Sequence, residues 1–297
     1  MTAAAVLPLR FQVGARTLAA IPRRLVRVPL SLADVLAGDA PALPPLPADS
    51  HGYLITSLPA SQLDAIGADG LVSHVRQRYT RYFVDLLAGE DAWLAGLSAN
   101  TRSGLKRKAK KLAALPGFAV RRFRTADEIA AFHPLARAVS ATTYQERLLD
   151  AGLPADPAPL LRLAAADRLR AWLLEVEGAP IAYLCCSADG DTLRYDQVGH
   201  DPAHAALSPG TVLQVEAMRD LFAERRFARF DFTEGEGQHK RQLASDGGAC
   251  LDVLLLRPTL ANRAALGALG AFDASMARAK RAANHPLLAR LAKRVRR

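Results

Sequence analysis

The stretch YDQVGHDPAHAALSPGTVLQVEAMRDLFAERRFARFDFTEGEGQHK, from Tyr195 to Lys240, decides the fold. It begins at the end of an alternating strand and continues into a loop that carries Ser208-Pro209-Gly210. Apolar residues then recur at helical spacing, namely Val212, Leu213, Val215, Met218, Leu221 and Phe222. A second strand, from Phe227 to Phe232, ends in a polar, glycine-rich turn. The stretch therefore predicts a helix whose backbone N–H groups can hold an anion beside a cluster of carboxylates.

Strands and helices on either side extend this unit into an α/β domain. Upstream, three strands are expected at hairpin spacing with turn-forming residues between them: 172–177, 181–187 and 192–199. They are preceded by a strand over 118–123, a helix over 126–149 with a break near Pro134, and a helix ending at 169. Downstream, a strand covers 250–256 and stops before Pro258. The predicted order is β-α-α-β-β-β-α-β-α-β, in a mixed central sheet flanked by helices.

The first hundred residues show elements but no catalytic constellation. Short strands are expected around Phe11 and Val26, followed by a proline-rich loop over 38–50. A strand from Gly52 to Leu58, a helix from Ser61 to Val75 and a strand over 78–87 complete the region. We expect a structural half-domain that shapes the substrate cleft.

Composition limits the protein class. The 297 residues carry a net charge of +10 and are 50% hydrophobic, which indicates a large core and an anionic partner: phosphate-bearing cofactor, nucleic acid or membrane surface. The three cysteines, Cys185, Cys186 and Cys250, lack metal-ligand spacing, so neither a metal site nor a disulfide framework is expected. Apolar runs are too short for a membrane span, and the N-terminus lacks the basic start of a signal peptide. We expect a cytoplasmic protein, with attachment to the inner face of the membrane as an alternative.

Two segments are strongly basic. Between Thr101 and Arg124 the chain has nine Lys or Arg and no acid, and after Asp273 it has eight and no acid. A solvated helix face is the ordinary meaning of such runs. Their single sign also allows weak contact of the segments 102–124 and 278–297 with a membrane surface or RNA. The first run lacks the aromatic residues that a single-strand stacking platform needs.

Over half of the chain resembles the GNAT acyltransferase superfamily, and more narrowly its CelD/BcsL-type, FemAB-like acetyltransferases. Four features carry the resemblance: the helix SANTRSGLKRKAKKL at 98–112, the three successive strands, Ser208-Pro209-Gly210 entering a helix, and Phe230-Asp231-Phe232 followed by Gly235 and Lys240. The loop has the single glycine Gly210, and His239 stands where members often have tyrosine. The resemblance implies an N-terminal half-domain at 1–96, itself a degenerate second GNAT-like half, a GNAT-like domain at 97–258 and a basic helical tail at 259–297.

The resemblance implies transfer of an acyl group from acetyl-CoA or another acyl-CoA to an amine, without a metal. The expected bases are Asp231 and Glu234, with His239 as a proton donor to the thiolate or as the base. Binding of acyl-CoA is expected at Val198, Gly199, Ser208, Gly210, Thr211, Val212 and Leu213. Lys240, Tyr144 and Arg102 are expected to bind substrate. A structural role remains open for each, such as turn capping by Asp231, helix capping by Ser208 and packing by Tyr144.

The acceptor implied by the resemblance is an amine-bearing small molecule or a precursor of the cell envelope or of a polysaccharide. Two alternatives stay open. The first is a FemAB-like transferase that uses aminoacyl-tRNA as donor. The second is a catalytically silent domain that binds RNA or a membrane surface through its basic faces. The oligomeric state and the acyl-chain length are not indicated.

Overall fold

The computed structural model describes residues 4–13, 16–66, 70–143, 146, 152–235 and 237–283. The chain divides into two compact units, each built from separate stretches of sequence. The terminal unit contains residues 1–30, 37–78 and 250–297, and the central unit contains residues 31–36 and 79–249. This grouping does not follow the linear segments 1–96, 97–258 and 259–297, which stay a prediction.

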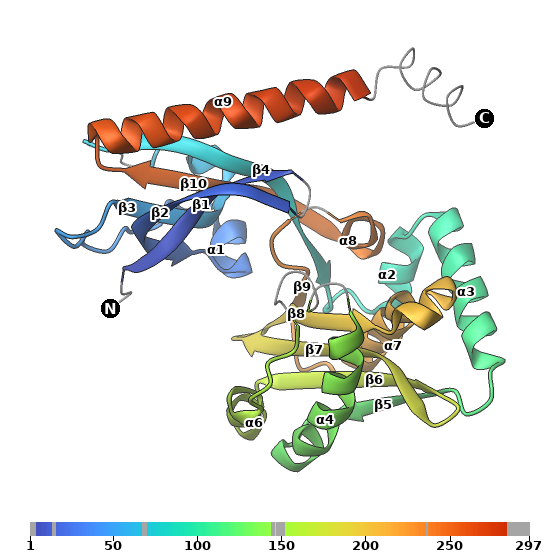
Figure 1. Ribbon diagram of the computed structural model, residues 1–297. Coiled ribbons are helices and arrows are strands. Elements are labelled where there is room, and N and C mark those ends of the chain that lie inside the picture. The colour runs from blue at the N-terminus through green and yellow to red at the C-terminus, as the bar shows by residue number, and fades with distance from the viewer. Residues whose placement is uncertain are drawn as a thin grey trace. The chain divides into compact units, whose positions relative to one another are not determined.

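The terminal unit is a sheet with one long helix (Figure 1). Its strands are β1 (Ala5–Val13), β2 (Arg16–Pro29), β3 (Gly52–Pro59) and most of β10 (Asp246–Leu256), in that order across the sheet. β2 is antiparallel to β1 and parallel to β3, and β10 is antiparallel to β3. The helix α9 (Leu260–Ala283) packs Leu266 and Leu269 against Leu254 and Leu256 of β10. The predicted strands at 52–58 and 250–256 are confirmed.

The predicted helix from Ser61 to Val75 is wrong. Among the described residues of this segment, 61–66 and 70–75, the 3₁₀ turn η1 (Ala60–Gln62) is the only helical element, and the strand β4 (Val72–Asp85) starts after a turn at Gly70. The apolar residues do enter the core, since Leu63, Ile66 and Val75 pack in one cluster. Aromatic and β-branched residues follow Val75, and tertiary pairing of such residues in a strand prevails over a helical spacing in so short a segment.

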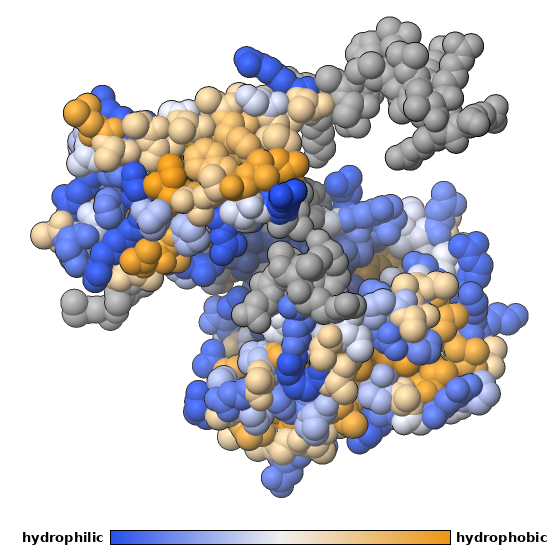
Figure 2. Space-filling model, viewed as in Figure 1, coloured by the Kyte–Doolittle hydropathy of each residue, from blue (hydrophilic) through white to orange (hydrophobic). Residues whose placement is uncertain are grey.

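The central unit holds the strand order β4-β9-β8-β7-β6-β5 (Figure 1). Its strands after β4 are β5 (Ala119–Phe123), β6 (Leu169–Val176), β7 (Ala179–Asp189), β8 (Thr192–His200) and β9 (Arg229–Asp231). Its helices are α1 (Leu32–Ala37), α2 (Glu90–Gly96), α3 (Ala99–Ala113), α4 (Ala126–Thr142), α6 (Ala158–Ala165), α7 (Pro209–Glu224) and α8 (Gln238–Leu243), with the 3₁₀ turn η2 (Pro202–Leu207) before α7. The predicted order of strands and helices after residue 117 is confirmed. Hydrophilic residues cover α3 (Figure 2).

The core of the central unit lies between α7 and the sheet. Leu213, Met218 and Leu221 of α7 are fully buried and share one cluster with Leu193 of β8 and Phe230 of β9. A second cluster, on Phe132 and Ile129 of α4, covers other residues of β6 and β7. The sheet therefore separates two hydrophobic layers, as in an α/β sandwich with helices on both faces.

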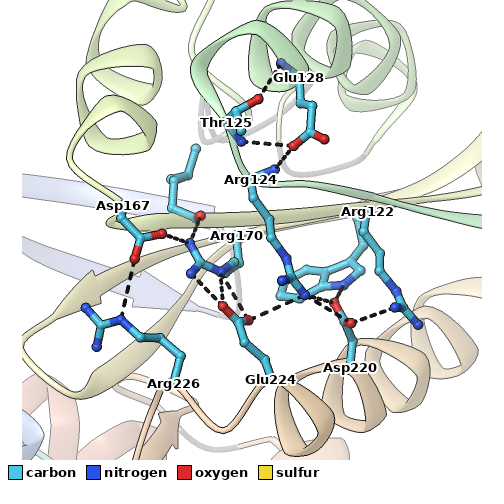
Figure 3. A network of polar contacts seen from close by, with 11 residues as sticks. Arg122, Arg124, Thr125, Glu128, Asp167, Arg170, Asp220, Glu224 and Arg226 are labelled. Atoms are coloured by element: carbon cyan, nitrogen blue, oxygen red, sulfur yellow. Dashed lines mark hydrogen bonds and ion pairs between the residues drawn. The ribbon is translucent and has the colours of Figure 1, made fainter.

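A polar network fixes the second half of α7 to β5 and β6 (Figure 3). Asp220 accepts hydrogen bonds from the Trp172 indole at 2.9 Å and from Arg124 at 3.2 Å, and it pairs with Arg122 at 2.9 Å. One turn later, Glu224 pairs with Arg170 at 2.6 Å. Asp220 and Arg170 are each only 3% exposed, so these pairs are well shielded from water.

The network gives a prediction about stability. Trp172→Phe should lower the free energy of unfolding by about 2–3 kcal/mol, because the buried Asp220 carboxylate loses a charge-assisted hydrogen bond and a small cavity opens. Urea unfolding followed by circular dichroism measures this loss. Arg122→Gln is the matched control, since the Arg122 side chain is 59% exposed, and it should cost under about 1 kcal/mol. Equal losses in the two variants would contradict the assignment.

Candidate functional site

The strands β8 and β9 diverge in the middle of the central unit. β9 runs parallel to β8 but pairs with it only from Thr192 to Arg194. β8 continues to His200 along β7. Among the described residues, the segment Tyr195–His200 has no strand partner on the side away from β7. Its unpaired backbone groups are therefore available to a ligand that lies extended along β8.

An aromatic cluster lies where the strands part. The Tyr195 ring centroid lies 5.9 Å from those of Phe230 and Phe232 and 6.1 Å from that of His239. Burial raises the pKa of Tyr195, with a smaller contribution from Cys186, so its hydroxyl stays protonated over the physiological range. The cluster connects the sheet to α8 and brings His239 to the divergence, although Tyr195 and His239 are 44 positions apart in sequence.

The start of α7 has the form that an anion site needs. Ser208 adopts the left-handed conformation with a φ of 55°, and Pro209 and Gly210 open the helix. The Thr211 and Val212 N–H groups donate to the Ser208 carbonyl at 3.1 and 3.3 Å. The Gly210 N–H has no partner among the described residues. The helix dipole adds a favourable field for negative charge.

The predicted side-chain capping by Ser208 is wrong. Its hydroxyl makes no capping hydrogen bond to α7, and its backbone is left-handed where N-cap residues are usually extended. A Cβ added to Gly210 would find only the His200 imidazole, at 3.8 Å, so the space beside this residue is open. The Val212 and Leu213 side chains are buried, so these two residues can face a ligand only through their backbone.

On β8, Gly199 is needed for packing. A Cβ at Gly199 would lie 2.4 Å from the Tyr183 ring and 2.9 Å from the Thr143 methyl group. Any side chain at this position would displace the end of α4 from the sheet. Val198 is partly exposed beside it. Their predicted contact with acyl-CoA stays a prediction.

Asp231 forms a buried ion pair with Arg81. The two guanidinium contacts are 2.6 and 3.2 Å long, from β4 to β9, and Asp231 also accepts the Thr233 N–H at 2.8 Å. Asp231 is fully buried and Arg81 is 3% exposed. Burial alone would lower the pKa of Arg81, but its hydrogen bond and charge pairing with Asp231, and the charge of Glu234, raise it. A carboxylate held in this way is poorly placed to take a proton from substrate, so the geometry favours a structural role for Asp231, including the turn-capping role considered above.

The loop after β9 presents Glu234. Thr233 and Gly235 both have positive φ, 61° and 87°, so the chain turns sharply here. The Lys240 ammonium donates to the carbonyls of Glu234 at 2.7 Å and Gly235 at 3.3 Å. Lys240 is 9% exposed and thus holds the loop in place, while the partly exposed Glu234 carboxylate projects near Arg81. This geometry favours a structural role for Lys240 over substrate binding, because its ammonium group already donates to two carbonyls.

His239 is an exposed titratable group of the site. One side of its ring faces Tyr195 and Phe232, and the residue as a whole remains open to solvent. Partial burial lowers the pKa of His239, and the neighbouring Lys240 charge lowers it further. His239 is therefore neutral at pH 7 and able to accept a proton.

The other two predicted substrate residues have different outcomes. Arg102 donates to the carbonyls of Leu94 (3.3 Å), Ala95 (3.2 Å) and Leu97, and so caps the end of α2. This use of the guanidinium favours a structural role. Tyr144 lies outside the described residues. Among the residues that the structure describes, no group of three His, Cys, Asp or Glu side chains is arranged to hold a metal ion.

A comparison with known protein families identifies the domain that contains most of this site. Residues 99–241 match the model of the acetyltransferase (GNAT) domain. This segment is a GNAT domain. The match covers α3 to α8, and so includes the diverging strands, the start of α7 and His239. No curated protein matches the chain.

Solved structures show the same fold at low identity. The C-terminal domain (DUF2156) of a proposed lysylphosphatidylglycerol synthetase from Agrobacterium fabrum is 13% identical, with a TM-score of 0.52, over 71% of this chain and 69% of that one. L-PGS from Bacillus licheniformis is 11% identical, with a TM-score of 0.45 and coverages of 72% and 71%. FemX is 11% identical, with a TM-score of 0.46 and coverages of 86% and 88%. The family match together with the observed mixed sheet flanked by helices confirms the GNAT-like fold, whereas a degenerate GNAT-like half at 1–96 stays a prediction.

The sequence did not indicate the part that two residues, Tyr195 and Arg81, play in the site. Tyr195 was part of the expected strand, but nothing in the sequence indicated that it would meet His239. Arg81, which neutralises Asp231, lies outside the matched segment, 150 residues away along the chain. Its only sequence signal is a charged residue between the aromatic residues of β4, where burial requires a partner.

Among the described residues, no helix is both long and apolar enough to cross a membrane.

Proposed function

We propose that this GNAT domain is an N-acyltransferase, of the FemAB-like branch, that moves an acyl group from acyl-CoA to an amine. The acceptor class is a small molecule or a precursor of the cell envelope or of a polysaccharide. The observation that carries the proposal is the divergence of β8 from β9 beside the start of α7. Together these provide an open strand edge for an extended thioester arm and N–H groups for an anionic end.

The donor would lie along β8 with its acyl group towards the aromatic cluster. In this arrangement the backbone from Tyr195 to Gly199 supplies hydrogen bonds to the pantetheine arm. The pyrophosphate meets the Gly210 N–H and the positive end of the α7 dipole. The Ser208 hydroxyl, which the helix does not use, is a further donor to a phosphate oxygen.

Acyl transfer requires one new bond and one proton relay. The amine nitrogen attacks the thioester carbonyl carbon, the C–N bond forms, and the C–S bond breaks as the tetrahedral adduct collapses. His239 is the favoured base because it is neutral at pH 7 and open to solvent. It takes the ammonium proton and can return a proton to the departing thiolate. Glu234 is the second candidate, placed to attract the ammonium group of the acceptor.

Calorimetry and thermal shift with acetyl-CoA, longer acyl-CoAs and tRNA test the choice of donor. The proposal expects saturable binding of at least one acyl-CoA and a rise in melting temperature. Binding of the acyl-CoA by this domain should persist in the His239→Ala variant, because His239 acts on the acceptor side. A failure of every CoA species to bind would overturn the proposal.

The start of α7 offers a specific prediction. Gly210→Ala should leave the melting temperature unchanged, because space exists for the added methyl group. It should weaken acyl-CoA binding by about 10-fold, since the methyl group keeps phosphate oxygens away from the helix N–H groups. Calorimetric titration of both proteins measures the change.

Gly104→Ala on α3 is the matched control, since a Cβ there meets nothing within 4 Å. Its affinity for acyl-CoA should equal that of the unaltered protein. If Gly210→Ala bound acyl-CoA equally well, the pyrophosphate would have to lie elsewhere.

One observation favours a second candidate, a transferase that uses aminoacyl-tRNA as donor. The cations at 106–111 on α3 have no ion-pair partner in the described part of the chain, and RNA is one polyanion that would supply partners. This candidate predicts tight, salt-dependent tRNA binding and no stabilisation by any acyl-CoA. The binding experiment above therefore separates the two donors.

A further inference from the structure

The exposed face of α3 carries an uncompensated positive charge. Lys106, Arg107, Lys110 and Lys111 are exposed, and the helix contains no acid. Lys106 with Lys110, and Arg107 with Lys111, are neighbours four residues apart, where like charges repel. Within the described residues none of the four has an ion-pair partner. The repulsion between these cations weakens α3 on its own. An anionic surface beside α3 would neutralise the cations and relieve the repulsion.

An apolar slot runs beside this charged face. It has a volume of about 150 Å³ and lies between α2, α3 and α7. Leu94 of α2, Leu105 and Ala109 of α3, and Val212 and Val215 of α7 form its apolar walls. The charged residues Arg102, Glu216 and Arg219 also line it, and Glu216 pairs with Arg219. Lys106 lines the slot as well as the exposed face, so the positive charge and the apolar surface are continuous. Figure 2 shows hydrophobic surface beside the hydrophilic residues of α3.

We propose that α3 and this slot form a docking surface for an anionic phospholipid of a bilayer. The headgroup phosphate pairs with Lys106 and Lys110, and part of one alkyl chain enters the slot. Charge complementarity selects the anionic headgroup, and the apolar walls select the chain. The docking surface goes beyond the proposed acyl transfer and does not depend on which donor the domain uses.

The slot is what favours a lipid over RNA. Electrostatic attraction of α3 would serve either partner. Single-stranded nucleic acid is bound on aromatic side chains that stack on the bases, and α3 has none. A wall of leucine and valine next to the cations offers nothing to a nucleotide, whereas it removes alkyl surface from water.

Vesicle co-sedimentation of the full chain tests the proposal. The protein should bind phosphatidylcholine vesicles that contain phosphatidylglycerol and should not bind pure phosphatidylcholine vesicles. Combined Lys106→Gln, Arg107→Gln and Lys110→Gln should weaken binding by about 100-fold, since each cation near the surface contributes about 5-fold. Glutamine is a good helix former, so α3 should persist, as circular dichroism would verify.

A matched triple variant controls for net charge. Arg162→Gln, Arg194→Gln and Arg225→Gln remove three exposed charges of the central unit that lie outside α3. They should change binding by under about 5-fold, because salt screens charges that lie beyond about 10 Å from the membrane. Equal losses in the two triple variants would overturn the proposal, and so would an RNA oligonucleotide that displaces the protein from the vesicles at equal phosphate concentration.

A separate variant tests the slot with all charges kept. Ala109→Met fills the space between Leu105 and Val212, and it should abolish the calorimetric binding of dodecyl phosphate, with inorganic phosphate as the probe that lacks a chain. If dodecyl phosphate bound the Ala109→Met protein as it binds the unaltered one, the slot would not hold an alkyl chain and the proposal would fail. Both tests measure lipid binding without acyl transfer, so their failure is distinguishable from failure of the proposed function.

Discussion

Arg81→Met should lower the free energy of unfolding by about 3–5 kcal/mol, a large part of the stability of a domain this size. The cause is Asp231, which is fully buried and would lose two hydrogen bonds of 2.6 and 3.2 Å to the guanidinium group. A carboxylate left without its partner in the core pays the cost of desolvation with no compensation. Urea unfolding followed by circular dichroism gives the difference.

The double variant Arg81→Met with Asp231→Leu provides the control. It removes both charges and leaves apolar groups of similar size, so most of the lost stability should return. A loss of under about 1 kcal/mol in the free energy of unfolding of Arg81→Met would contradict the structural role of the Arg81–Asp231 ion pair. If Asp231 acted instead as the base, Asp231→Asn would lose activity while the melting temperature stayed unchanged, and the buried pair predicts a lower melting temperature.

The order of elements was predictable because local chemistry specifies it. The turns at 177–180 and 188–191 contain glycine, proline and aspartate between β-rich runs, which determines hairpins from a few neighbouring residues. The apolar spacing of α7 runs from Val212 to Phe222, about three turns, long enough for a helical period to be unambiguous. The segment 61–75 is different, because a short apolar run fits a helix or a strand, and pairing within the sheet decided for β4.

The roles of single residues were less predictable because their partners are distant or are backbone groups. The sequence predicted Asp231 as a base at a strand end. In the structure its carboxylate pairs with Arg81, which lies 150 residues earlier in the chain. Arg102 and Lys240 were predicted to bind substrate, but backbone carbonyls of the end of α2 and of the loop after β9 accept their hydrogen bonds. Carbonyl groups leave no mark in a sequence, so the pattern shows the charge without the acceptor. The place of Gly210 in the first turn of α7 was easier to predict, since it depends on a local turn into a helix, and its contact with acyl-CoA stays a prediction.

His239→Ala should lower kcat/KM for acyl transfer by about 10²–10³-fold while acyl-CoA still binds. This expectation follows from the proposed role of His239, which lies at the divergence of β8 and β9, as the base that takes the proton of the attacking amine. His239→Gln keeps the size and polarity of the ring and should lose as much, because an amide cannot accept the proton. Glu234→Gln is the competing assignment: a larger loss there, with His239→Ala close to full activity, would move the role of base to Glu234.

The pH dependence of the reaction gives a second and independent measure. Burial and Lys240 lower the pKa of His239 below its usual 6.5, so the base is deprotonated at pH 7 and becomes protonated only below that value. The logarithm of kcat/KM should therefore be level near pH 7 and fall with unit slope at a pH below 6.5. The same shift has a consequence for stability, because the unfolded chain takes up the His239 proton before the folded one does. The contribution is complete above pH 6.5 and is lost as the pH falls through the lowered pKa. The residual activity of His239→Ala should lack the acidic fall in rate, and a fall of the same slope in that variant would show that another group titrates.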